Sequence, residues 1–134
     1  MAFRELEHTA DVRVRIEAPT LDALFEDAGM ALFSIMYGTC LEGGVERQIA
    51  LASGDLESLL TEYLSELLYL SEAEGLVFCS FQVSISGTSL EATARGEPLD
   101  PSRHAGREVK GISYSGLEIT TAAEGYATEV IFDI

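Results

Sequence analysis

Basic residues are scarce in this chain. Only 8 of its 134 residues are Lys or Arg, against 23 Asp and Glu, and the formal net charge is -15. Because proteins bind the phosphates of nucleic acids mainly through Lys and Arg, we expect no direct nucleic-acid binding. A role in RNA metabolism would therefore have to act through another protein.

Long apolar runs and cysteines are also rare. No apolar run reaches the roughly 20 residues that a membrane-spanning helix needs, so we expect a soluble protein. The two cysteines, Cys40 and Cys79, lack the spacing of metal ligands. In a chain without a signal peptide, so sparse a pair is typical of reduced thiols that fill the core, which predicts a cytoplasmic protein.

The length is that of one domain over residues 1–134, with a core that needs neither a disulfide nor a metal to be stable. Two stretches have the apolar spacing of helices, from Leu21 to about Tyr37 and from Leu56 to about Ala73, and glycines that favour a helix end follow each of them. The second stretch has the broader apolar stripe. We expect it at the centre of the core.

Most of the remaining chain alternates between apolar and polar residues, as half-buried strands do. The expected strands are Phe3–Glu7, Val12–Glu17, Val45–Leu51, Val77–Ile85, Ser89–Arg95, Val109–Tyr114, Gly116–Thr121 and Tyr126–Ile134, with one long loop at residues 97–107. This order indicates an α+β fold, with mostly antiparallel sheet structure and both amphipathic helices packed on its core side. The last strand has apolar residues on both faces near its end, which predicts a central position for it.

Two carboxylates stand at the ends of apolar strands, Asp11 near the start of the chain and Asp133 near its end. If these strands are neighbours, Asp11, Asp133 and the α-carboxylate of Ile134 converge into a group of hard oxygen ligands suited to Ca²⁺ or Mg²⁺. The alternative is that Asp11 caps its own turn and Asp133 is a solvated chain end. The sequence has no phosphate-binding glycine loop, no histidines at metal spacing and no nucleophile elbow, which favours a modulator of a partner over a self-contained enzyme.

Several segments resemble the archease family, in order and over nearly the whole chain. They are His8-Thr9-Ala10-Asp11, Thr20-Leu21-Asp22-Ala23-Leu24-Phe25, Leu67-Leu68-Tyr69-Leu70, Arg95-Gly96-Glu97-Pro98-Leu99-Asp100-Pro101, Glu108-Val109-Lys110-Gly111-Ile112-Ser113-Tyr114 and Val130-Ile131-Phe132-Asp133-Ile134. A single segment of this kind would be weak evidence, whereas the combination is specific.

The resemblance implies a protein cofactor of the tRNA-splicing RNA ligase RtcB, which promotes guanylylation of the ligase and its multiple turnover. It also implies that Asp11, Asp133 and Ile134 are metal ligands, with Ca²⁺ the usual ion and Mg²⁺ an alternative. His8 and Lys110, within matching segments, are candidates for contact with the partner.

One position departs from the family pattern, because Ser115 stands where family members commonly have a histidine. If that histidine serves the partner, its role is missing or shifted in this chain. Two other classes of function stay open. One is a chaperone-like modulator of proteins that act on DNA or RNA, and the other is a metal-dependent hydrolase or transferase.

Overall fold

The computed structural model describes residues 11–38, 40–41 and 43–134. Its elements in chain order are β1 (Asp11–Ala18), α1 (Leu21–Tyr37), β2 (Val45–Ala52), α2 (Leu56–Glu74), β3 (Leu76–Ser86), β4 (Ser89–Pro98), β5 (Gly111–Ser113), β6 (Thr120–Ala122) and β7 (Gly125–Asp133). The expected strand at residues 3–7 lies outside the described residues. From β1 onward, the order of the elements agrees with the order predicted from the sequence.

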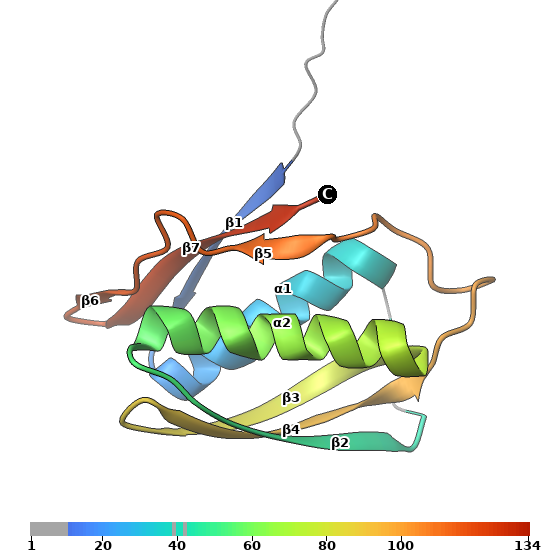
Figure 1. The fold of residues 1–134 in the computed structure, drawn as a ribbon, viewed down its shortest axis with the longest axis horizontal. Helices are drawn as coiled ribbons and strands as arrows, with labels where there is room; N and C mark the ends of the chain where they lie inside the picture. Colours follow the sequence, from blue (N-terminus) through green and yellow to red (C-terminus); the bar gives the residue numbers. More distant parts are fainter. Residues whose placement is uncertain (1–10, 39, 42) are drawn as a thin grey trace, which may run out of the picture.

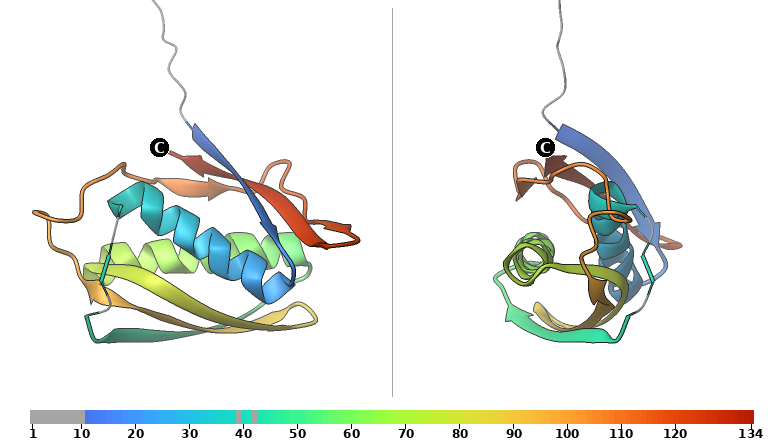
Figure 2. Two further views of the ribbon diagram at one scale, coloured as in Figure 1. Left: turned by 180° about the vertical axis from the view of Figure 1, so that it is seen from behind. Right: turned by 90° about the vertical axis from the view of Figure 1, so that its right-hand side faces the viewer.

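The strands form two antiparallel sheets. In the first, β7 lies between β1 and β5, and the short β6 also pairs with β7; in the second, β4 lies between β2 and β3. Both helices lie in the space between the two sheets (Figure 1), where they are neighbours whose axes cross at an angle (Figure 2). The predicted α+β class and the central position of the last strand are thus confirmed.

Each helix begins at a side-chain acceptor and ends at a glycine. The Thr20 hydroxyl accepts a first-turn N–H of α1 at 3.1 Å, and the Asp55 carboxylate does the same for α2 at 2.7 Å. Gly38 and Gly75 follow the last helical residues with φ of 76° and 65°, values that favour glycine. In the described part of the chain, neither helix has both the length and the hydrophobicity of a membrane span.

The core between the sheets is built around α2. Five of its side chains are completely buried: Leu59, Leu60, Tyr63, Leu64 and Leu67. Burying a leucine fully contributes roughly 1.5–3 kcal/mol before conformational entropy is subtracted, so this helix carries much of the apolar driving force. The predicted central position of the second helix is confirmed.

Acidic side chains of α1 cover the edge of β3. Asp22 and Glu26 are one helical turn apart, and their carboxylates accept the N–H groups of Ile85 at 3.0 Å and of Val83 at 2.9 Å. These amide groups belong to the β3 edge that faces away from β4. The two carboxylates therefore satisfy backbone donors that no neighbouring strand in the described residues reaches.

The segment between β5 and β6 differs from the prediction of two longer strands. It forms a turn closed by a bond from the Leu117 N–H to the Tyr114 carbonyl at 3.1 Å. The Ile119 N–H then donates to the Glu57 carboxylate of α2 at 3.0 Å. The Glu57 carboxylate thus accepts the N–H group that a neighbouring strand would otherwise bind. The alternation of apolar and polar residues along the chain could not indicate this contact.

Candidate functional site

The register of β1 and β7 brings the two predicted carboxylates together. Asp11 and Asp133 are directly opposite partners in this antiparallel pair, so their side chains project to the same face of the sheet. The alternate residues of the strands, among them Ile16, Val130 and Phe132, are buried in the core. The shared face of the aspartates is therefore the outer one, where Asp11 is half-buried and Asp133 is exposed.

The start of β5 supports the same corner from the other edge of β7. The Lys110 N–H donates to the Asp133 carbonyl at 2.7 Å, and Gly111 is the cross-strand partner of Asp133. A Cβ added at Gly111 would lie 3.9 Å from Asp133 Oδ2, so glycine leaves the side of this carboxylate open. The Lys110 side chain is exposed at this end of the sheet.

The paired aspartates are residues that could contribute to holding a hard divalent cation, since carboxylate oxygens are ligands that Ca²⁺ and Mg²⁺ prefer. The last residue, Ile134, follows Asp133, and the C-terminus lies beside the start of β1 (Figure 1). Among the described residues, no group of three or more His, Cys, Asp or Glu side chains could hold a metal ion. A cation at this corner would therefore depend on the terminal carboxylate or on oxygens from a partner.

The structure separates the remaining predicted positions from this corner or does not describe them. His8 lies outside the described residues. Ser115 is exposed in the turn after β5, at a surface hollow of about 410 Å³ that runs along the outer face of β1 and β7. That hollow is also lined by Arg13, Arg15 and Glu129, and no imidazole from the described residues lines it.

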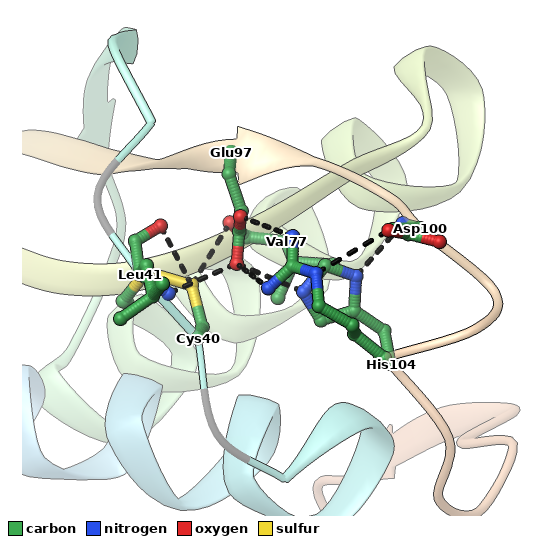
Figure 3. The surroundings of a disulfide bond; sticks show 8 residues. Cys40, Leu41, Val77, Glu97, Asp100 and His104 are labelled. Carbon is green, nitrogen blue, oxygen red and sulfur yellow. Dashed lines mark hydrogen bonds and ion pairs between the residues drawn. A yellow bond between two sulfur atoms is a disulfide. The ribbon is translucent and has the colours of Figure 1, made fainter.

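A buried cluster of charged and polar groups centres on Glu97, which is only 6% exposed. Its Oε1 accepts from Arg103 Nη2 at 2.6 Å, and its Oε2 accepts from the Leu41 N–H at 2.9 Å and lies 2.9 Å from His104 Nε2 (Figure 3). His104 Nδ1 accepts the N–H of Asp100 at 2.8 Å. The ring proton is therefore on Nε2, which donates to Glu97.

These bonds keep the Glu97 carboxylate ionised. The hydrogen bond from Arg103, then those from the Leu41 N–H and from His104, lower the pKa of Glu97 from 4.5 to about 2. Both oxygens are occupied, which leaves none for a substrate. The cluster instead joins β4 to two loops, and the N–H of Gly43 adds a bond to the Gly96 carbonyl at 2.8 Å.

The sequence predicts one long loop at residues 97–107, and this buried cluster was not predicted. The available signal was an acid, a guanidinium and an imidazole within eight residues of one another. Spacing along the chain does not reveal that the Leu41 segment folds over the carboxylate and buries it.

The prediction of reduced thiols is wrong, because Cys40 and Cys79 form a disulfide with their Cα atoms 5.5 Å apart. Cys79 is the extra residue of a β-bulge, where the pairing of β3 with β4 shifts between Phe78 and Ser80. The end of α1 brings Cys40 to this bulge from 39 positions away. Sequence spacing could not indicate that approach, and the expectation of a cytoplasmic protein loses the support that reduced thiols gave it.

Comparison with known proteins gives concordant matches over the whole fold. The model of the Archease protein family (MTH1598/TM1083) matches residues 3–134. The chain is 39% identical to the protein archease of Methanosarcina mazei, over 98% of this chain and 95% of that protein. It is also 39% identical to the protein archease of Pyrococcus furiosus, over 98% of each.

Two solved structures share the fold. Protein 1598 of Methanobacterium thermoautotrophicum superposes with a TM-score of 0.80, at 30% identity and 96% coverage of both chains. An archease of Thermotoga maritima, described as a possible chaperone, superposes with a TM-score of 0.72 over 100% of this chain and 98% of its own. At 19% identity, this second likeness concerns the fold alone.

Proposed function

Because the chain belongs to the archease family, we propose that it activates an RtcB-type tRNA-splicing ligase by promoting guanylylation and multiple turnover of that ligase. The observation that carries the proposal is the pairing of Asp11 with Asp133 at the outer corner of β1 and β7, next to Ile134. These two aspartates, together with Ile134, are the residues that the family resemblance implies as metal ligands.

The physical role of the corner follows from its charge. Two carboxylates about 4 Å apart repel by about 4 kcal/mol at an effective dielectric of about 20, so a cluster of three needs a counter-charge. Asp11, Asp133 and the Ile134 carboxylate would hold Ca²⁺, or Mg²⁺, which supplies a compact positive charge with room for further oxygen ligands. The backbone of Lys110 is bonded to Asp133 and its side chain is exposed, so Lys110 would be available for contact with the partner.

An activator fits this corner better than an independent RNA-joining enzyme. The corner offers carboxylates but, among the described residues, no nucleophile paired with a base. The buried Glu97 and His104 pair is fully used by its own hydrogen bonds. The net charge of -15 also opposes direct RNA binding, so the protein would act on the ligase and not on RNA.

The test adds this protein to an RtcB ligase with GTP and Mn²⁺, and follows guanylylation of the ligase and turnover in RNA joining. The wild-type chain should raise both, whereas Asp11→Asn and Asp133→Asn should lose most of the stimulation with unchanged circular dichroism. Glu17→Gln is the matched control, because it removes one charge from the same face of β1 at the opposite end of the strand. No change in ligase turnover at a stoichiometric dose would refute the proposal.

A chaperone-like role, which the sequence had left open, is the second candidate, and the family member from Thermotoga maritima is described as a possible chaperone. A protein of that kind would bind its partners without accelerating nucleotidylation. Complex formation with the ligase that leaves guanylylation unchanged would therefore favour this second candidate.

A further inference from the structure

The Cys40–Cys79 disulfide lies where its sulfurs border the protein surface. Both cysteines are half-buried, and both line a surface hollow of about 270 Å³ between α1 and β3. The other side chains of that hollow are mainly apolar, including Met30, Phe33 and Phe78. A small thiol can therefore approach the sulfurs without displacing the core.

The surroundings of Cys40 disfavour a negative charge on its sulfur. Cys40 Sγ lies 3.5 Å from the carbonyl oxygen of Val77 and 3.7 Å from that of Leu41 (Figure 3). Cys40 also follows the C-terminus of α1 at Gly38, the negative end of the helix dipole. A neutral Cys40 thiol can donate to the Val77 carbonyl, whereas a thiolate there is repelled, so Cys79 is the better leaving sulfur.

The native fold does not depend on the disulfide alone to hold this segment. The Leu41 N–H donates to Glu97 at 2.9 Å, and the Gly43 N–H donates to the Gly96 carbonyl at 2.8 Å. Cys40 packs against the hydrophobic core as a partly buried residue, and the buried side chains of α1 and α2 that form the core include neither cysteine. Breaking the bond therefore loosens the attachment of Cys40 to β3, but leaves the contacts of Leu41 and Gly43 with β4 and the fold in place.

We propose that Cys40–Cys79 is a thiol–disulfide exchange site, reduced and reoxidised in the folded protein by a small thiol and its disulfide. The incoming thiolate attacks Cys40 Sγ, the sulfur–sulfur bond breaks, and its electron pair leaves on Cys79 Sγ, which then takes a proton. A second thiolate attacks the sulfur that was added, and releases Cys40 to be protonated. Two small thiols are thereby oxidised to one small disulfide, while the protein gains two electrons and two protons.

This proposal goes beyond the activation of a ligase and does not rest on it. The first experiment incubates the wild-type protein in native buffer with mixtures of reduced and oxidised glutathione. Free thiols are then alkylated and counted by mass spectrometry. Reduction should track the glutathione ratio, with native circular dichroism throughout, and should reverse when oxidised glutathione is restored. A disulfide that resists reduction until denaturant is added would overturn the proposal.

The second experiment identifies the sulfur that is attacked. Wild-type protein is exposed briefly to reduced glutathione and quenched in acid, and the mixed disulfide is located by peptide mapping. The adduct should be on Cys40, and an adduct mainly on Cys79 would overturn the assignment. The reaction of the single variants with Ellman's reagent is an independent measurement. The Cys79 thiol in Cys40→Ser should react faster than the Cys40 thiol in Cys79→Ser. The reverse order would contradict the assignment of Cys79 as the leaving sulfur.

Discussion

The imidazole of His104 lies 2.9 Å from the buried carboxylate of Glu97 through Nε2, while its Nδ1 accepts the N–H of Asp100 at 2.8 Å. Both ring nitrogens are thus used within the protein. The pair anchors the long loop after β4, which runs on to Lys110 and its bond to Asp133. The pair is thus a structural contact that holds the first part of this loop against β4.

Glu97→Gln should weaken the dependence of stability on acid pH. Because the pKa of Glu97 is lowered to about 2 by its hydrogen bonds, the carboxylate stabilises the fold above its ordinary pKa of 4.5, and this contribution disappears as the pH falls from 4.5 toward about 2. Urea unfolding at a series of pH values should show that the wild-type chain loses stability more steeply than the variant as the pH falls from 4.5 toward about 2. Parallel curves would mean that the cluster does not favour the ionised form.

Tyr63→Phe should leave the protein equally stable or make it more stable, by up to about 1–3 kcal/mol. Its hydroxyl is buried without a hydrogen-bond partner among the described residues, and burial, with a smaller effect from the Glu26 charge, raises the pKa of Tyr63. Tyr37→Phe is the matched control, because the Tyr37 hydroxyl lies 3.1 Å from Ser71 Oγ. Loss of this hydrogen bond should lower the free energy of unfolding by about 1 kcal/mol. The free energy of unfolding of both variants is measured by chemical unfolding. If Tyr63→Phe loses as much stability as Tyr37→Phe, the Tyr63 hydroxyl has a hydrogen-bond partner.

Gly96→Ala should destabilise the fold by about 3 kcal/mol or more, because an added methyl group would collide with the Val77 carbonyl and with the backbone of Phe78 at the bulge. Gly54→Ala is the control, since a Cβ there meets nothing within 4 Å. Thermal unfolding of the two variants should differ widely. Similar melting temperatures would show that β3 and β4 can separate at the bulge at little cost.

Local features of this fold were readable from the sequence, and long-range ones were not. Apolar periodicity and the glycines at positions 38 and 75 gave both helices to within about a residue, because a helix is stabilised by residues close in sequence. The sequence raised the pairing of the strands that carry Asp11 and Asp133 only as a condition for a metal site, and the structure shows that these two strands are neighbours. The Cys40–Cys79 bond joins residues 39 positions apart, and the burial of Glu97 depends on a third segment that covers it, which no local pattern encodes.

A tag added after Ile134 should weaken divalent-ion binding, measured by calorimetry, and should also weaken stimulation of an RtcB ligase. The tag removes the α-carboxylate next to the paired Asp11 and Asp133 while leaving the core residue Phe132 in place. A tag before Met1 is the control and should be tolerated far better, with equal circular dichroism in both forms. Equal ion affinity of the two tagged proteins would remove the terminal carboxylate from the site.

The Asp22 and Glu26 carboxylates of α1, which are bonded to the edge of β3, also affect how other protein chains can bind to this sheet. A sheet edge with unsatisfied amide groups invites strand addition, the route by which sheets recruit extended peptides or polymerise edge to edge. Asp22 and Glu26 occupy two of those amide groups on β3, and they add negative charge that repels a second acidic copy. These two bonds therefore disfavour the addition of another strand on the β3 side of this sheet. An extended segment that docks there must first displace two helix carboxylates.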